Sequence, residues 1–310
     1  MQKRTIVELC LFLIAVVWAL NFSVIKSSLD EIDPLSYNGL RFIFAAAVVW
    51  AVLLWNKQSV RIPRKDWLPL LGMGVLGNLV YQGFFIIGID YTLSANAAVM
   101  LGTIPIWVAL LAHFFSDEKM NVFKTAGVMC AFGGILFIIA GGREEFSFGS
   151  DTFIGDAIMI MAAVVWALFT ILSRPFLKRY TPLQFSAIMS TIGCVLLLIV
   201  GLPSMIELNW REVSGAAYGG VLYSGALAIG AAYIIWNYGL QTVGAVRSAT
   251  YQNLVPVLGL FFGVILLNEE LSLLQYFGSA LVVAGIVLAR WRRGKIIAQS
   301  YTERPQSCTK

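Results

Sequence analysis

The chain has 310 residues, of which 59% are hydrophobic and only 13% are charged, and its mean hydropathy is +0.80. Soluble domains usually contain about 25% charged residues, so this composition excludes an ordinary soluble protein and indicates a membrane protein. The net charge of +5 needs no nucleic-acid partner, because the distribution of basic residues between the two membrane sides accounts for it.

Ten apolar segments are long enough to cross a hydrocarbon layer of about 30 Å, which takes roughly 20 residues. The first follows Lys3 and Arg4, but it is longer than the apolar region of a typical signal peptide and lacks a clean cleavage site, so we predict a retained span. The linkers are mostly shorter than 15 residues and leave no room for a soluble domain. The ten segments cover residues 6–26, 36–55, 67–89, 93–115, 122–141, 154–173, 182–202, 214–237, 245–267 and 271–291.

The basic residues indicate on which side of the membrane the chain ends lie. With ten spans both termini share one side, and all but four of the 22 Lys and Arg residues fall there. Cytoplasmic loops are enriched in Lys and Arg, so we expect both termini in the cytoplasm of a multi-pass protein of the cell (inner) membrane. The four exceptions are Lys26, Arg41, Arg143 and Arg211.

The two halves of the chain repeat one another. The string AVVWAL occurs at 15–20 and again at 163–168, a shift of 148 residues, and the Pro-Leu pair at 34–35 returns at 182–183. Later in each half the shift is 151 residues, so three residues are inserted between the two registers. The pairs at the larger shift are Gly88 with Gly239, Pro105 with Pro256, Glu118 with Glu269, Gly127 with Gly278 and Gly134 with Gly285.

Each half contains five spans, an odd number, so the second half enters the membrane from the opposite side. The expected fold is an all-α integral membrane protein with ten transmembrane helices. It forms two inverted five-helix repeats over residues 1–143 and 151–293, followed by a cytoplasmic tail over 294–310. Inverted repeats that exchange conformations are typical of transporters, which bind substrate near the midplane.

One matched pair of prolines, Pro105 and Pro256, falls near the middle of the fourth and ninth spans. A proline frees a backbone carbonyl and permits a kink, so we predict a hinge or cavity role for this pair. Simple tolerance of proline in membrane helices is the other interpretation.

Polar and aromatic side chains gather on faces of the predicted spans. Polar groups that face lipid are costly, so we expect them to line a pocket with aromatic walls and a few amide and hydroxyl groups. Hydrogen bonds between helices, and aromatic residues at the membrane interface, are the alternative explanation for any one of them. The predicted substrate-binding residues are Trp18, Asn21, Lys26, Asn78, Tyr81, Gln82, Asn96, Thr103, Trp107, Trp166, Tyr233, Trp236, Asn237, Tyr251 and Asn253.

Basic residues at span ends are candidates for gates. Arg41, Arg174 and Arg247 belong to this group, and Lys26 occupies the same repeat position as Arg174 on the opposite side. Each would close the pathway or attract anionic groups on its own side. Snorkelling to the lipid headgroups is the alternative, and it is favoured for Arg174, which lies in a basic cytoplasmic loop.

Several kinds of chemistry are missing from the sequence. No Asp or Glu lies near the centre of a predicted span, which weakens a proton-coupled exporter of lipophilic cations and favours neutral, zwitterionic or anionic solutes. One histidine, His113, cannot supply a two-His metal site, and the four cysteines lack metal-ligand spacing. No GxxxxGK[ST] string is present, so we expect no ATP hydrolysis, no cofactor and no enzyme activity.

Four strings resemble the EamA-like family of the drug/metabolite transporter superfamily: WALNFSVIK at 18–26, LRF at 40–42, AYIIWNYGLQTVGAVRSATYQNLVPVLG at 232–259 and LNEELSLLQYFGSALVVAGIVL at 267–288. The resemblance extends over nearly the whole chain, although SDEKM at 116–120 stands where the family commonly has Gly-Glu. It implies a central cavity lined by the first, third, fourth, sixth, eighth and ninth spans. It also implies export of amino acids or other metabolites, or carriage of nucleotide-linked or sugar-like solutes.

The expected function is secondary transport of small metabolites such as amino acids, with the direction of export taken from the resemblance. The alternative is import or exchange of an anionic or sugar-like solute, for which Lys26, Arg41 and Arg247 are the expected counter-charges. A membrane scaffold or intramembrane enzyme is a further alternative, which the inward polar faces and the missing catalytic groups argue against. The expected partners are a small-molecule substrate and the lipid bilayer, and one chain carries both repeats, so a monomer suffices.

Overall fold

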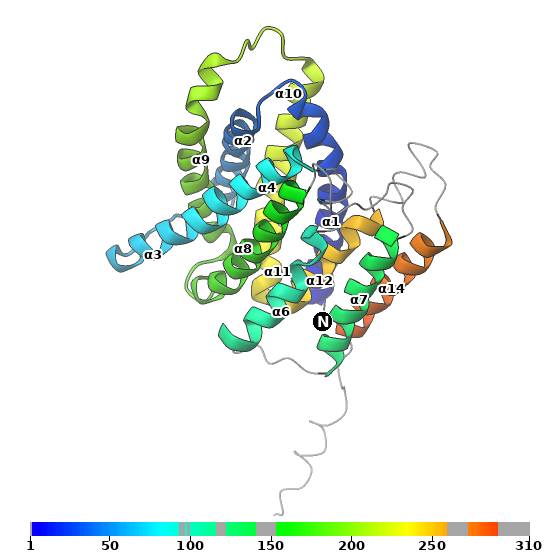
Figure 1. Cartoon of the computed structure of the whole chain (residues 1–310). Coiled ribbons are helices and arrows are strands. Elements are labelled where there is room, and N and C mark those ends of the chain that lie inside the picture. The colour runs from blue at the N-terminus through cyan, green and yellow to red at the C-terminus, as the bar shows by residue number, and fades with distance from the viewer. Residues whose placement is uncertain are drawn as a thin grey trace, which may run out of the picture.

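The computed structural model describes residues 2–92, 97, 100–115, 122–140, 153–258 and 272–290. Within these ranges the regular structure is helical, without strands (Figure 1). Three shorter apolar helices cover Met100–Phe115, Val122–Phe137 and Leu273–Leu288. The predicted all-α, multi-pass membrane class is therefore confirmed. The helices of the described residues that are long and apolar enough to cross a membrane are Arg4–Leu29, Pro34–Trp55, Arg64–Asp90, Ile154–Leu177, Pro182–Glu207 and Gly215–Thr242.

The helices follow one another closely along both halves of the chain. Those of the first half are α1 Gln2–Leu29, α2 Pro34–Trp55, α3 Arg64–Gly74, η1 Val75–Val80, α4 Tyr81–Asp90, α6 Ile104–Phe115 and α7 Val122–Ala140. Those of the second half are α8 Phe153–Leu177, α9 Pro182–Glu207, α10 Gly215–Tyr223, η2 Ser224–Ala231, α11 Ala232–Thr242, α12 Ala245–Thr250, η3 Tyr251–Asn253 and α14 Leu273–Arg290. The predicted segment 245–267 is described as far as residue 258.

Two long helices begin at matched caps. The Asp33 side chain accepts hydrogen bonds from the backbone N–H groups of Leu35 and Ser36 at the start of α2. Thr181, 148 residues later, forms a capping box with Gln184 at the start of α9. A proline follows each cap at the first helical position, where the missing N–H costs nothing. The local sequence therefore fixes where both helices start.

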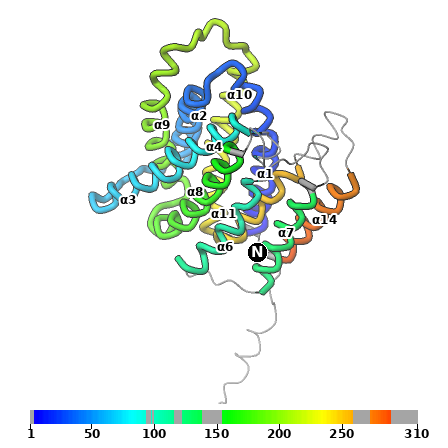
Figure 2. The backbone as a smooth tube through the Cα atoms, viewed as in Figure 1, coloured from blue at the N-terminus to red at the C-terminus, as the bar shows by residue number. Residues whose placement is uncertain are grey.

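Two π-helical segments interrupt otherwise α-helical spans. The segment η1 joins α3 to α4, and η2 joins α10 to α11, so each span follows one continuous path (Figure 2). The segment η1 ends directly before Tyr81, and η2 contains Ala228 and Ile229, all of which line the central cavity described below. π-helical turns are rare and occur often at functional sites, because they rotate the following side chains relative to an α-helix.

The helices α7 and α14 lie side by side at one edge of the bundle and meet through glycines (Figure 1). A Cβ atom placed on Gly134 would lie 2.5 Å from the carbonyl oxygen of Gly278, and one on Gly285 would lie 2.5 Å from that of Gly127. Close backbone approach of this kind is the usual way in which membrane helices gain packing energy without a hydrophobic driving force.

Many large apolar side chains point away from the bundle. Trp55 is 88% exposed, Leu68 79% and Ile199 65%. An exposed apolar surface of this extent is unfavourable in water and is expected where helices face lipid tails.

Glu31, between α1 and α2, anchors the start of α10. Its carboxylate accepts hydrogen bonds from the backbone N–H of Ser214 (2.6 Å) and from its hydroxyl (2.8 Å), and these bonds lower the pKa of Glu31. A carboxyl whose pKa is lowered by folding stabilises the fold above its ordinary value of about 4.3 and loses that contribution as the pH falls through the folded value.

We therefore expect Glu31→Gln to lower the melting temperature of the detergent-solubilised protein at pH 7. The difference from the unmodified protein should shrink as the pH falls below the ordinary carboxyl value and through the lowered pKa of Glu31, where the wild-type carboxyl is also protonated. The exposed carboxylate of Glu207, at the end of α9, provides the control Glu207→Gln. A difference that persists unchanged at low pH would contradict a role for the charge.

Candidate functional site

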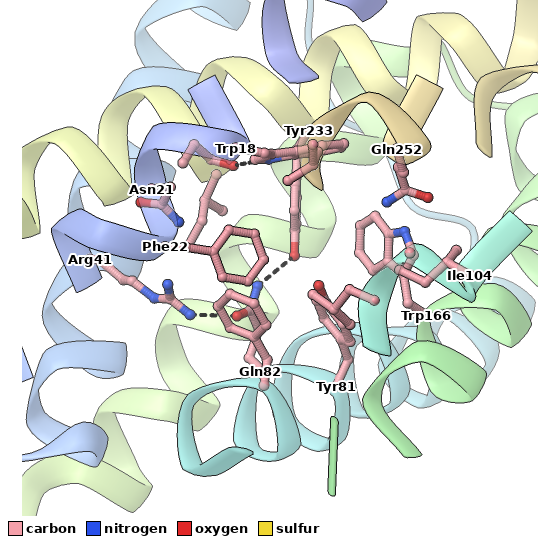
Figure 3. Close-up of a pocket in the computed structure, with 16 residues that line it drawn as sticks. Trp18, Asn21, Phe22, Arg41, Tyr81, Gln82, Ile104, Trp166, Tyr233 and Gln252 are labelled. Atoms are coloured by element: carbon pink, nitrogen blue, oxygen red, sulfur yellow. Dashed lines mark hydrogen bonds between the residues drawn. The ribbon is translucent and has the colours of Figure 1, made fainter. Parts of the chain in front are cut away.

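A cavity lies between residues of the first half and residues of the second half (Figure 3). It is formed by α1, α2, α4, α8, η2 and α11, together with residues around 101–104 and 252–255. Water-sized spheres occupy about 60 Å³ of it, which is room for about five water molecules. This volume is smaller than that of a typical small-molecule site, which is about 300–1,000 Å³. Its polar lining residues are Asn21, Arg41, Tyr81, Gln82, Tyr233 and Gln252, and its indole groups are Trp18 and Trp166.

Aromatic rings form the walls of the central cavity. Trp166 is only 2% exposed and lies at the middle of the group. Its ring centroid is 4.6 Å from that of Tyr81, 5.7 Å from that of Trp236 and 6.0 Å from that of Tyr233. Rings at these distances stabilise one another beyond the area they bury, so they form a firm apolar surface for a ligand.

A chain of hydrogen bonds crosses the floor of the central cavity. Nη2 of Arg41 donates to Oε1 of Gln82 (2.5 Å), and Nε2 of Gln82 bonds the hydroxyl of Tyr233 (3.1 Å). That hydroxyl donates to Oδ1 of Asn78 (3.3 Å), whose Nδ2 donates to the carbonyl oxygen of Met189 (3.0 Å). All four side chains are buried, so the network holds them in fixed positions.

Arg41 is a buried cation in this cavity, with 1% of its surface exposed. Besides the bond to Gln82, its Nε donates to Oδ1 of Asn38 (2.9 Å) and its Nη1 to the hydroxyl of Ser224 (3.3 Å). These partners are all neutral. Among the described residues no carboxylate forms an ion pair with Arg41.

Some buried polar atoms at the central cavity have no hydrogen-bond partner. They are Nε1 of Trp166, Oδ1 of Asn21 and Oε1 of Gln252. Burying a polar atom without a partner costs about 1–3 kcal/mol. Such atoms in a native protein therefore usually form a hydrogen bond with a ligand or with water. The indole of Trp18, by contrast, donates to the carbonyl oxygen of Ala228 (2.9 Å).

Lys26 lies away from the central cavity. Its Nζ donates to the carbonyl oxygens of Ile89 (3.1 Å), Asp90 (3.1 Å) and Thr92 (3.2 Å), at the C-terminal end of α4. A cation there satisfies carbonyls that have no partner within the helix and interacts favourably with the helix dipole. In this structure Lys26 therefore ties α1 to α4.

The other two predicted gate cations also lie outside the central cavity. Nη1 of Arg247 is 3.7 Å from Oε1 of Glu8, which links α12 to α1. Arg174 lies in the last turn of α8. Their part in gating stays a prediction.

Both prolines lie next to an interruption of the helical path. Pro105 is the second residue of α6 and follows a turn at Thr103, while Pro256 follows the 3₁₀ segment η3. Nε1 of Trp107 donates to the hydroxyl of Thr103 (3.1 Å), so these two predicted binding residues bond each other and do not line the cavity. Asn96 lies outside the described residues.

The remaining predicted binding residues stand behind the cavity wall. Asn78 supports Tyr233, and Trp236 packs against Trp166. Nδ2 of Asn237 donates to the hydroxyl of Ser186 (2.9 Å). Tyr251 and Asn253 are buried but do not border the cavity. The predicted binding residues that do line it are Trp18, Asn21, Tyr81, Gln82, Trp166 and Tyr233.

Gln252 lines the central cavity but was not predicted. Its neighbours Tyr251 and Asn253 were predicted instead, Tyr251 because it is equivalent to Met100 at the shift of 151 and Asn253 because it lies nearby. The three residues form a 3₁₀ turn, which has three residues per turn instead of 3.6 and so changes which side chain faces inward. Phe22 was missed as well, because an apolar residue in an apolar helix carries no distinguishing signal.

The sequence is similar over most of its length to proteins named as transporters. It is 27% identical over 277 residues to the uncharacterized transporter YoaV of Bacillus subtilis (strain 168), covering 89% of this chain and 93% of the relative. It is 29% identical over 292 residues to an uncharacterized transporter of Archaeoglobus fulgidus, covering 93% and 98%. It is 28% identical over 284 residues to a protein of Streptantibioticus cattleyicolor named probable terminal-alkyne amino-acid exporter, covering 91% and 92%.

One solved crystal structure shares the fold, with a TM-score of 0.75 and 20% sequence identity over 90% of this chain and 96% of the other. The sequence model of the EamA-like transporter family matches twice, at residues 5–140 and 153–291. These matches span nearly the whole chain, and the helices they cover surround one cavity. The chain belongs to the EamA-like transporter family, whose members are transporters and not enzymes.

Proposed function

We propose that this protein is a secondary transporter of small metabolites such as amino acids. It works by alternating access between two inverted five-helix repeats, and the central cavity is its substrate site. The observation that carries the proposal is the cavity itself, which lies between the halves and is lined by aromatic rings, a buried cation and unpaired polar atoms. Binding at the interface of inverted repeats is how such transporters expose one site to each side in turn.

Contacts between repeat-equivalent residues support the two-repeat arrangement. Gly134 and Gly285 are equivalent at the shift of 151, as are Gly127 and Gly278. Gly134 packs on Gly278, and Gly285 packs on Gly127, so the same contact occurs twice with the roles of the halves exchanged. Such reciprocity is the signature of a two-fold axis between the two helices.

The pair α2 and α9 repeats this reciprocity at the shift of 148. Gly39 lies against Leu197. The equivalent positions, Ala187 and Val49, belong to one buried cluster. The hydrogen bond between Gln82 and Tyr233 joins two residues that are themselves equivalent at the shift of 151, which is expected for a pair on the axis.

Export is the proposed direction, with both termini in the cytoplasm and no use of ATP. The naming of one relative as a probable amino-acid exporter supports the direction and the solute class. The bias of Lys and Arg towards one set of loops supports the orientation. Because one chain contains both repeats, a monomer is sufficient for the cycle.

The second candidate function is import or exchange of an anionic solute. The observation that favours it is Arg41, which places an unneutralised positive charge in the cavity. An anion enters such a site more readily than a neutral sugar, because the charge of Arg41 is largely removed from water.

Uptake into proteoliposomes that contain the purified full chain tests the proposal. Radiolabelled amino acids are screened first, then organic anions and sugars, each with and without a pH gradient. We expect saturable uptake of at least one amino acid. Uptake of anions without amino acids would favour the second candidate, and no uptake of any class by folded protein would refute a transport function.

A further inference from the structure

We propose that Arg41 binds the carboxylate of the transported solute, with the indole N–H of Trp166 as a second donor to the same group. The inference rests on the proposed function, because it names the chemical group that the transporter recognises. It begins from the energy needed to keep a guanidinium group in the middle of a membrane protein. That energy is large unless an opposite charge or a complete set of hydrogen bonds offsets it.

The surroundings of Arg41 offset its charge only in part. The faces of Tyr37 and Phe85 lie 5.7 and 5.4 Å from its guanidinium carbon, which attracts a cation weakly. Its hydrogen-bond partners are neutral amide and hydroxyl groups. The group cannot lose its proton in a protein, so the positive charge persists. In the described part of the chain no carboxylate forms an ion pair with Arg41.

The residues that carry the free donors of this region line one cavity. Three of the five guanidinium N–H bonds of Arg41 are used, which leaves two. Nε1 of Trp166 has no acceptor, and the ring of Tyr81 borders the same cavity. In Figure 3 Arg41 and Trp166 approach the open centre from opposite sides, with Tyr81 and Gln82 between them. The missing partner is therefore an acceptor with negative charge.

The charge balance selects the class of anion. A carboxylate carries one negative charge, which matches one guanidinium, and its two oxygens suit the planar donor fork. A phosphate dianion would bring a second charge, for which the described lining residues offer no second cation. The other proposed counter-charges are engaged elsewhere, because Lys26 bonds the end of α4 and Arg247 pairs with Glu8.

The test compares acids with their amides on the purified full-length protein in detergent. The melting temperature is followed as each of the common L-amino acids, or its α-carboxamide, is added. For at least one amino acid we expect the half-saturating concentration of the acid to be about 10- to 100-fold lower than that of the amide, the range for a hydrogen bond to a charged group.

Variants then assign the preference to a residue. Arg41→Gln should abolish the difference between acid and amide, Arg41→Lys should keep part of it, and Trp166→Phe should reduce it. Arg211→Gln removes an exposed cation that is not among the lining residues of the cavity. It should leave the difference between acid and amide unchanged. The comparison on the unmodified protein needs no variant, so the test stands if Arg41→Gln does not fold.

Equal binding of acid and amide would overturn the assignment of the carboxylate to Arg41. An acid preference that persists in Arg41→Gln would overturn it as well. The same holds if none of the amino acids tested stabilises the protein. Uptake measured on the same proteins separates the two proposals. Transport of a neutral sugar, unchanged in Arg41→Gln, would overturn the carboxylate site and leave the transporter function. An acid preference without any uptake would keep the site and refute transport.

Discussion

Replacing Gly134 with valine is expected to destabilise the protein by about 3 kcal/mol or more, the upper end for overpacking a tight interface. The first added carbon would lie 2.5 Å from the carbonyl oxygen of Gly278 and 2.7 Å from the backbone nitrogen of Val282. Backbone atoms cannot rotate out of the way as a side chain does, so α7 and α14 would have to separate. The measurement is the melting temperature in detergent, together with the yield of folded protein.

The neighbouring Gly133 provides a matched control. A Cβ there meets nothing within 4 Å, so Gly133→Val should change stability by less than about 1 kcal/mol. Gly285→Val should behave like Gly134→Val, because its Cβ would lie 2.5 Å from both the carbonyl oxygen of Gly127 and the backbone nitrogen of Ala131. Equal effects at Gly133 and Gly134 would contradict the packing described for this pair of helices.

Trp166→Ala is expected to abolish uptake and to lower stability by about 3–5 kcal/mol. The indole is 2% exposed and packs against Tyr81, Trp236 and Tyr233, so its removal leaves a large cavity where the wall of the site stood. Melting temperature and proteoliposome uptake are measured on the same preparation, which separates loss of folding from loss of the site.

Two further tryptophan variants make this result specific. Trp166→Phe keeps an aromatic ring and removes the unpaired N–H, so we expect folded protein with reduced uptake. Trp67→Ala removes an indole that is 60% exposed and should leave both quantities nearly unchanged. Full uptake by Trp166→Ala would show that the solute does not pass this cavity.

The all-helical membrane fold could be predicted because each span corresponds to a run of about 20 apolar residues in the sequence. The internal repeat was predicted from strings and glycines that recur at fixed shifts, such as AVVWAL and the pair Gly134 and Gly285. These signals are local in the sequence. They do not depend on how the helices are arranged.

The environment of each charged residue could not be predicted, since it depends on tertiary contacts. Lys26 and Arg41 both fall at the ends of predicted spans, yet Lys26 bonds the carbonyls of α4 while Arg41 is buried beside the cavity. Sequence reasoning treated the two alike. Their tertiary partners separate them, because the Nζ of Lys26 reaches the carbonyls at the end of α4 whereas the guanidinium of Arg41 bonds Gln82 and Ser224.

The same reason explains which polar residues were missed. Helical spacing placed Trp18 and Asn21 on one face of α1, and both residues line the cavity. It misjudged the region around Gln252, where the helix tightens to a 3₁₀ turn. Regular spacing holds only as far as the helix is regular, and here the helical geometry changes next to the cavity.

Alternating access is the central claim, and counterflow tests it most directly. Proteoliposomes that contain the purified protein are loaded with an unlabelled amino acid that the uptake screen identifies, and are then diluted into a trace of the labelled form. We expect the label to accumulate transiently above its outside concentration, because one cavity that opens to each side in turn exchanges inner for outer solute. Entry at the same rate into loaded and empty vesicles, without accumulation or saturation, would contradict a carrier with a single alternating site.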